Sequence, residues 1–87
     1  MINIDELKKK IIYRSNYRGT KEMDKLLGAF VKKYIDELSD NDLVKLEKLL
    51  DIDDSNLYNF LNDLETDFII EKNNVTDLFK NFEYVKK

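Results

Sequence analysis

The sequence predicts an all-α fold, a small antiparallel bundle of about five helices. Apolar residues recur every three to four positions through most of the chain, which is the period of a helix. The chain has no proline and only two glycines, and no stretch alternates between apolar and polar residues as a strand does. Its 87 residues suffice for one domain, so we expect residues 1–87 to fold as a single domain.

The first two helices are predicted over about residues 3–16 and 20–38. The second has the clearest apolar stripe on one helical face. Its members are Met23, Leu26, Leu27, Phe30, Val31, Tyr34, Ile35 and Leu38. Gly28 lies inside it at a cost of about 1 kcal/mol relative to alanine, which suggests that a neighbouring element comes close there. Gly19, between the two helices, suits a helix C-cap and a tight turn.

The third and fourth helices are predicted from their N-terminal caps. Ser39 and Asp42 have the spacing of a capping box, and leucines at helical spacing follow them. Asp53 or Asp54 can cap a fourth helix, because an aspartate side chain accepts hydrogen bonds from the first free backbone N–H groups. We expect Tyr58 and Phe60 of this helix to lie mainly in the core or to support it.

The C-terminal part is less regular. Residues 65–74 show no clear period, and the apolar residues 68–70 fit either a buried connector or a helical turn. A last helix fits the remaining apolar spacing. The residues on its apolar face are Val75, Leu78, Phe79, Phe82 and Val85.

The composition argues against an enzyme. The chain contains neither histidine nor cysteine, so it lacks the commonest general base, the thiolate nucleophile and the usual zinc ligands. Asp51, Asp53 and Ser55 have the spacing that opens a calcium loop. Asn56 and Asn62 stand where that loop needs glycine and glutamate, so we expect no metal site.

One polar turn, residues 17–24, joins the first two predicted helices. Turn chemistry explains much of it. Gly19 suits a left-handed conformation, and Glu22 and Asp24 complement the positive end of the second helix. On this interpretation Arg18 is an exposed charge.

The same residues also match a family motif. The pattern Arg18-Gly19-x-x-Glu22-x-Asp24 resembles the RGxxE motif, often extended to RGxxExD, of the succinate dehydrogenase assembly factors of the SdhE type. A second similar segment spans residues 49–61, and the resemblance extends over about residues 4–64.

This resemblance implies a protein that binds a partner and does no chemistry itself. Members of the family bind the flavoprotein subunit of succinate dehydrogenase, or in some bacteria that of fumarate reductase. They promote covalent attachment of FAD to a histidine of that subunit. We therefore expect no permanently bound cofactor in this chain, with FAD attached to the partner.

The resemblance assigns partner binding to seven residues, namely Arg18, Gly19, Glu22, Asp24, Tyr17, Tyr13 and Arg14. Gly19 would let the backbone approach the partner closely, and Arg18 would offer a planar fork of donors to a partner carboxylate or carbonyl. Glu22 and Asp24 would order the turn or pair with a partner base. The two tyrosines would add amphipathic contact area.

Charge leaves a second function open. The net charge is −3, yet residues 8–25 contain seven bases and two acids, a local balance of +5. A small helix-turn-helix module could hold nucleic acid phosphates with this segment. The acidic remainder of the chain and the interleaved Glu22 and Asp24 argue against it, so we expect no nucleic acid partner. An inert structural interaction domain is a third possibility.

The location is inferred from the N-terminus. It lacks the apolar stretch of a secretory signal and carries Asp5 and Glu6, which a mitochondrial transit peptide would avoid. No run of about 18 apolar residues could span a membrane. We expect a monomer in the bacterial cytoplasm.

Overall fold

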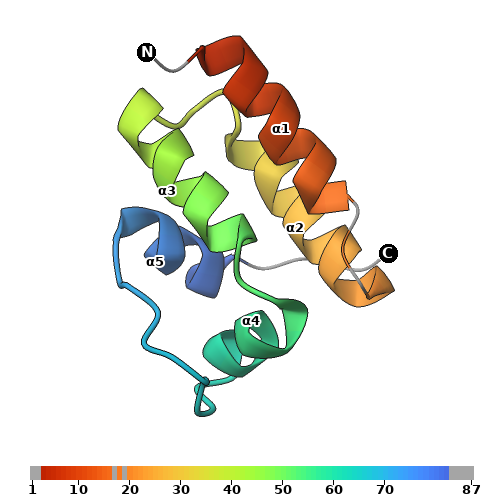
Figure 1. The fold of residues 1–87 in the computed structure, drawn as a ribbon, viewed down its shortest axis with the longest axis vertical. Helices are drawn as coiled ribbons and strands as arrows, with labels where there is room; N and C mark the ends of the chain where they lie inside the picture. Colours follow the sequence, from red (N-terminus) through yellow and green to blue (C-terminus); the bar gives the residue numbers. More distant parts are fainter. Residues whose placement is uncertain (1–2, 17, 19, 83–87) are drawn as a thin grey trace.

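The computed structural model describes residues 3–16, 18 and 20–82 of the chain. These residues form five helices and no strand, so the all-α prediction is confirmed. The helices are α1 (Ile4–Asn16), α2 (Lys21–Tyr34), α3 (Asp40–Leu50), α4 (Asp54–Leu61) and α5 (Asn74–Asn81). Successive helices from α1 to α3 run in opposite directions, as an antiparallel bundle requires (Figure 1).

Side chains of the sequence fix where four of the helices begin. Thr20, Ser39 and Asp53 each accept a hydrogen bond from a backbone N–H in the first turn of α2, α3 and α4. Each satisfies one of the N–H groups that a helix start leaves without an intrahelical partner. The fourth of these helices is α5, which begins after a capping box formed by Asn73 and Thr76. The sequence pattern did not reveal this capping box.

Two predicted helices are longer than the observed ones. α2 ends at Tyr34 instead of residue 38, because residues 35–38 form the turn that reverses the chain before the Ser39 cap. α5 ends at Asn81, and the predicted Val85 lies outside the described residues.

The core lies between α1, α2, α3 and α5. α1 packs against α2 and α3, and α3 packs against α5. Phe30 of α2 is fully buried, and its ring lies 5.2 Å from that of Phe79 on α5, in an edge-to-face arrangement that aromatic rings favour. Leucines of α3 and Leu57 of α4 complete this core.

Gly28 lies where α2 comes close to the end of α1, as its position suggests. A Cβ at Gly28 would lie 3.0 Å from Oδ1 of Asn16, the last residue of α1. The absence of a side chain at Gly28 therefore leaves room for the Asn16 side chain, just before the turn that carries the motif.

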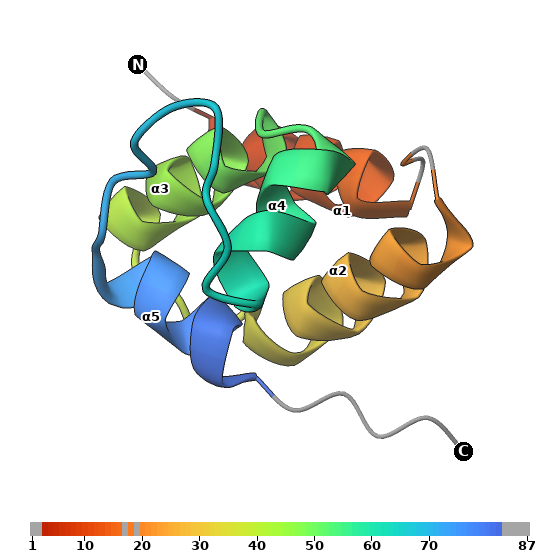
Figure 2. The ribbon, with the colours of Figure 1, turned by 90° about the horizontal axis from the view of Figure 1, so that it is seen from below.

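The short helix α4 closes one end of the bundle, and residues 62–73, here called the connector, return from it to α5 (Figure 2). Two expectations for this region are wrong. Tyr58 is 55% exposed, because only the opposite face of α4 reaches the core. Phe68 and Ile69 are also exposed, so the connector is neither buried nor helical there.

Candidate functional site

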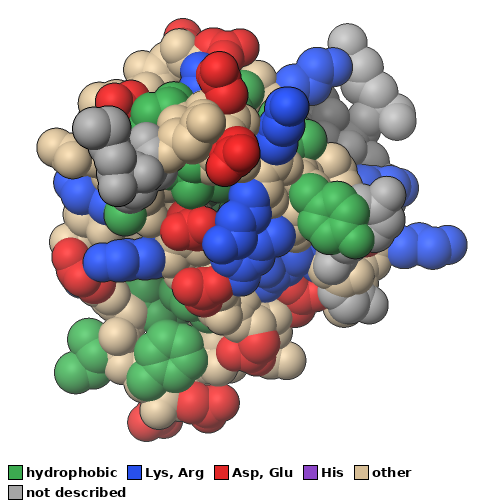
Figure 3. All heavy atoms as spheres, turned by 45° about the horizontal axis from the view of Figure 1, so that its top comes forward, with side chains coloured by type: hydrophobic (Ala, Val, Ile, Leu, Met, Phe, Trp, Pro, Cys, Tyr) green, Lys and Arg blue, Asp and Glu red, His purple; other side chains and the backbone are tan. Residues whose placement is uncertain are grey.

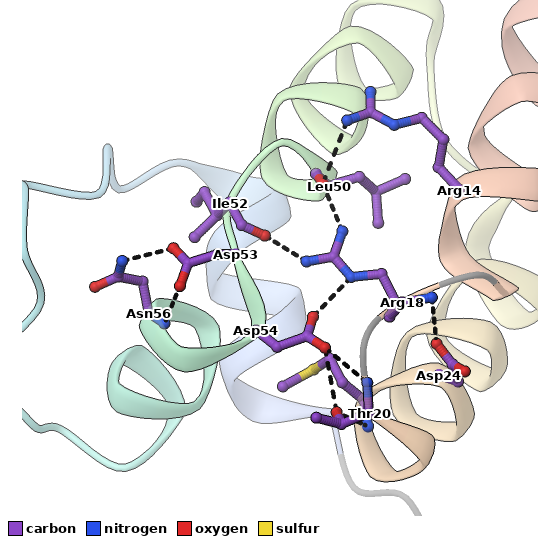
Figure 4. Close-up of polar contacts among 10 residues, drawn as sticks. Arg14, Arg18, Thr20, Asp24, Leu50, Ile52, Asp53, Asp54 and Asn56 are labelled. Atoms are coloured by element: carbon purple, nitrogen blue, oxygen red, sulfur yellow. Dashed lines mark hydrogen bonds and ion pairs between the residues drawn. The ribbon is translucent and has the colours of Figure 1, made fainter.

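The α1–α2 turn meets the α3–α4 connection at one end of the bundle, and the motif lies at this junction. Figure 4 shows the side chains that join the two segments. We call this junction the arginine corner. It comprises Arg18, Thr20, Asp24, Leu50, Ile52 and Asp54.

The Arg18 guanidinium lies at the centre of the arginine corner. Its Nε donates to Oδ1 of Asp54 at 2.8 Å, and Nη1 donates to the Leu50 carbonyl at 2.5 Å. Nη2 donates to the carbonyl of Ile52. The side chains of Arg18 and Asp54 are only 10% and 17% exposed, so this charged pair is largely removed from water. Pairing and additional hydrogen bonds are what make such burial tolerable.

The expectation that Arg18 is an exposed charge is therefore wrong. All three of its nitrogens donate to groups of the same chain, and the fork expected to meet a partner is occupied within the fold. The physical reason is the end of α3, whose last carbonyls have no intrahelical donor and attract a cation. Arg18 thereby connects the motif turn to the α3–α4 connection.

A second arginine binds the same helix end. Arg14, in the last turn of α1, donates to the Leu50 carbonyl at 3.4 Å and pairs with Asp51. Asp51 is 62% exposed, so this pair is much more accessible to water than the Arg18–Asp54 pair. Two cations thus lie at the negative end of α3.

Backbone groups on both sides of position 19 are also held. The Arg18 N–H donates to Oδ1 of Asp24 at 2.5 Å, and the Thr20 N–H donates to Oδ2 of Asp54 at 3.1 Å. The Thr20 hydroxyl donates to the same Asp54 oxygen at 3.2 Å and accepts from the backbone of α2. Asp24 therefore binds the backbone of the turn, and its pairing with a partner base stays a prediction.

The remaining motif residues differ in how they are placed. Glu22 is exposed in the first turn of α2 and makes no hydrogen bond or ion pair with a described residue. Tyr13 is exposed on α1. Tyr17 and Gly19 lie outside the described residues, so their predicted roles stay predictions.

A groove between α2 and α4 lies beside the arginine corner. Glu22, Met23 and Leu26 line it from α2, and Tyr58 and Leu61 line it from α4. The groove thus combines an acidic group of the motif with apolar side chains.

The basic segment is largely neutralised by acids from later in the chain. Lys8 pairs with Asp36 at 3.2 Å and Lys10 pairs with Glu47 at 3.0 Å. The two arginines pair with Asp51 and Asp54, as described above. Figure 3 shows Lys and Arg side chains gathered on one face with acidic side chains directly beside them. Among the described residues, acids pair with four of the seven bases, which weakens the case for a phosphate-binding surface.

Asp53 has a different task from its neighbour Asp54. It caps α4, and its Oδ1 accepts a hydrogen bond from the Asn56 side chain at 2.6 Å. This hydrogen bond, assisted by backbone donors, lowers the pKa of Asp53 below its ordinary value of 3.8. The charged form of Asp53 is therefore the form that the fold favours.

Asp54 is the charged residue of the arginine corner that the sequence pattern did not assign to the site. It was considered only as an alternative helix cap. A signal did exist, because two adjacent aspartates stand at the start of α4 and one cap requires only one of them. The second carboxylate was free to pair with a base from another part of the chain.

Comparison with known proteins agrees with the motif. The family model described as "Flavinator of succinate dehydrogenase" matches residues 9–83. The match extends well past residue 64, where the recognisable resemblance ends. No solved structure matches the chain significantly.

Curated relatives come from both eukaryotes and bacteria. "Succinate dehydrogenase assembly factor 2, mitochondrial" of Meyerozyma guilliermondii is 43% identical over 51 residues, covering 59% of this chain and 38% of the relative. The protein of the same name in Dictyostelium discoideum is 36% identical, covering 67% of this chain and 41% of the relative. "FAD assembly factor SdhE" of Acetobacter pasteurianus is 32% identical, covering 68% and 54%. The matched part is thus about half the length of these relatives or less.

These relatives correct one expectation. The predicted location in a bacterial cytoplasm is wrong, because the matches include mitochondrial assembly factors of yeasts and of Dictyostelium. The acidic N-terminus was too weak a criterion. None of the helices in the described part of the chain has the length and hydrophobicity of a bilayer-spanning segment.

The family match covers the arginine corner, the groove beside it and most of the core. None of the relatives named above is described as a nucleic-acid-binding protein. The chain belongs to the family of flavinators of succinate dehydrogenase.

Proposed function

We propose that this chain is an assembly factor that binds the flavoprotein subunit of succinate dehydrogenase and promotes covalent attachment of FAD to it. The observation that supports this most directly is the family match over residues 9–83, which includes the whole RGxxE turn. The names of the relatives, which are assembly factors of succinate dehydrogenase or of FAD, support the proposed activity and partner. The flavoprotein of fumarate reductase is a second candidate partner.

In this proposal the chain performs no chemical step of its own. It has no histidine or cysteine, and the histidine that receives the flavin belongs to the partner. The chain stabilises a conformation of the flavoprotein in which cofactor and histidine are aligned, and orientation alone lowers a reaction barrier substantially. It holds no permanent cofactor, binds as a monomer and acts in the mitochondrion.

The arginine corner and its surroundings form the proposed docking surface. Exposed groups make the contacts, namely Glu22 and Tyr13, together with the predicted contacts at Tyr17 and Gly19. Arg14, Arg18 and Asp24 shape the surface from within, since their polar groups bind other parts of this chain. This division changes the role first expected for Arg18.

The test mixes the purified chain with flavoprotein subunit that lacks covalent FAD, free FAD and a dicarboxylate. Covalent flavin is read as in-gel fluorescence after denaturation. We expect the chain to accelerate flavinylation. Glu22→Ala should reduce the rate at limiting factor about tenfold, which is the cost of losing one charge-assisted contact.

Glu37→Ala is the matched control. Glu37 is also exposed, lies just beyond the other end of α2 and makes no side-chain hydrogen bond with a described residue. Its removal should leave the rate unchanged. Flavinylation that proceeds equally fast without the chain would refute the proposed function.

A further inference from the structure

We propose that Asp54 is a positioning residue that holds the motif turn in its docking shape. The inference deepens the proposed function and rests on it. Asp54 lies outside the RGxxE motif, 36 residues after Arg18, and begins α4. No contact with the partner is required of it.

The carboxylate of Asp54 binds the turn on both sides of position 19. Its Oδ1 accepts from the Arg18 side chain at 2.8 Å. Its Oδ2 accepts from the Thr20 N–H at 3.1 Å and from the Thr20 hydroxyl at 3.2 Å. A single side chain therefore uses both oxygens to fix the two described residues that flank Gly19.

The other acids of the α3–α4 connection do not share this task. Asp51 pairs with Arg14 of α1, and Asp53 caps α4 and binds Asn56. Among the described residues, Asp54 is the acid of this connection that contacts Arg18 and Thr20. Of the two aspartates that pair with an arginine, Asp51 and Asp54, the side chain of Asp54 is the less exposed.

The same contacts couple the turn to the groove between α2 and α4. Asp54 is the first residue of α4, which supplies Tyr58 and Leu61 to the groove, and it also lines the groove itself. Thr20 caps α2, which supplies the opposite wall. Losing the Asp54 contacts would loosen the turn and one groove wall together.

Loss of the Asp54 contacts should affect binding of the flavoprotein and not the chemistry that follows binding. When only a fraction of molecules has the competent shape, the apparent Kd rises by the inverse of that fraction. Once bound, the partner selects the competent shape, so the rate of flavinylation at saturation stays the same. A positioning role therefore predicts weaker binding with normal activity of the saturated complex.

Asp54→Asn tests this role, since it keeps the shape of the side chain. The variant removes the charge and replaces one of the two acceptor oxygens by an amide nitrogen. We expect its Kd for the flavoprotein subunit to rise about tenfold, with the flavinylation rate at saturating chain near the wild-type value. The Thr20 amide should exchange its hydrogen about tenfold faster in the free chain.

Asp51→Asn is the matched control, because it makes the same charge change three residues away at the more exposed arginine pair. It should leave Kd and Thr20 exchange unchanged. A core variant with the same melting temperature as Asp54→Asn, such as Val75→Ala, controls for global stability and should bind normally.

Unchanged Kd and Thr20 exchange in Asp54→Asn would overturn the inference, and so would equally weak binding by the stability-matched Val75→Ala. The two proposals can fail separately. A wild-type chain that does not bind the flavoprotein would refute the proposed function, and with it the role of Asp54 in docking. Unchanged Thr20 exchange in a variant of a functional chain would refute the positioning role alone.

Discussion

Two connections on either side of α4 are held in very different ways. The α3–α4 connection is short, and Arg18 binds carbonyl groups at Leu50 and Ile52. The connector after α4 is longer and exposes the side chains of Phe68 and Ile69, the latter to 96%. Charged groups from the end of α1 and from the turn after it fix one connection precisely, whereas the other exposes apolar side chains to water.

The connector does have one buried anchor. Asn56 of α4 accepts from the Asp67 N–H at 2.9 Å and donates to the Asp67 carboxylate at 3.3 Å. Lys80 of α5 also pairs with Asp63 and lies over the Phe60 ring at 5.1 Å. The contrast between the connections therefore rests on a few polar side chains, each of which can be removed separately.

Removing the central guanidinium should have the largest effect. Arg18→Ala deletes three hydrogen bonds and leaves Asp54 without its charged partner. We expect a loss of about 2–3 kcal/mol in the free energy of unfolding, below the usual range for fully buried pairs because this pair keeps some exposure. Urea denaturation followed by circular dichroism measures the loss.

Arg14→Ala provides the comparison, since Arg14 binds the same carbonyl from a more exposed position. It should cost only about 0.5 kcal/mol. Equal losses from the two substitutions would contradict the distinction between the buried and the exposed arginine.

Removing the connector's anchor should have the next largest effect. Asn56→Ala leaves the Asp67 N–H and carboxylate without their partner on α4. We expect a loss of about 2 kcal/mol, because Asn56 is buried and its partners lose satisfied hydrogen bonds. Amide exchange should accelerate in the connector while the arginine corner stays protected.

The exposed Asn62→Ala, which removes only a bond to the Tyr58 carbonyl, should change stability by less than about 0.5 kcal/mol. Faster exchange at Thr20 in Asn56→Ala would show that the two connections are not independent.

A smaller effect is expected from the charge of Asp53. Hydrogen bonding from Asn56 lowers its pKa below 3.8 in the folded chain, so the ionised form stabilises the fold above that pH. This contribution disappears as pH falls through the lowered pKa. Asp53→Asn keeps a good helix cap but cannot titrate. The melting temperature of wild type should exceed that of the variant at about pH 5 and approach it by about pH 2. A difference in melting temperature that grows as the pH falls would contradict the stabilising role of the Asp53 charge.

The smallest effect is expected at the most exposed apolar side chain. Ile69→Ser should alter the free energy of unfolding by less than about 0.5 kcal/mol, because Ile69 contributes almost nothing to the core. Its neighbour Ile70 is half-buried and lines a groove with Leu49 and Thr76. Ile70→Ser should cost about 1 kcal/mol. Thermal unfolding of both variants compares them directly, and a larger loss at Ile69 would mean that the connector packs differently.

Helical periodicity predicted the fold because most of its information is local. The stripe on α2 and the cap at Ser39 were apparent from residue spacing, and the structure confirms them, although the predicted return bond from Asp42 is not formed among the described residues. Of the two candidate caps of α4, Asp53 and Asp54, the structure shows Asp53. The connector could not be placed, since its apolar run has no period and its anchor, Asn56, lies 11 residues before Asp67, the residue that it binds.

The site was only partly predictable for a different reason. The motif identified the right turn, yet the partners of Arg18 include two backbone carbonyls. Every residue has a carbonyl group, so no residue type in the sequence marks these partners. The exposure of Arg18 was therefore inferred from its charge alone. Its third partner, Asp54, is one of several acids in the same segment, and the sequence does not distinguish it from the others.

The ion pairs of the basic segment have a consequence for synthesis of the chain. Each joins a base near the beginning of the chain to an acid 28 to 37 residues later, from Asp36 to Asp54. While the chain is being synthesised, these four bases therefore lack their acidic partners until at least 28 further residues have been added. The contacts of Asp54 with Arg18 and Thr20 can form only after Asp54 has been added, so the motif turn acquires them late in synthesis relative to its own residues.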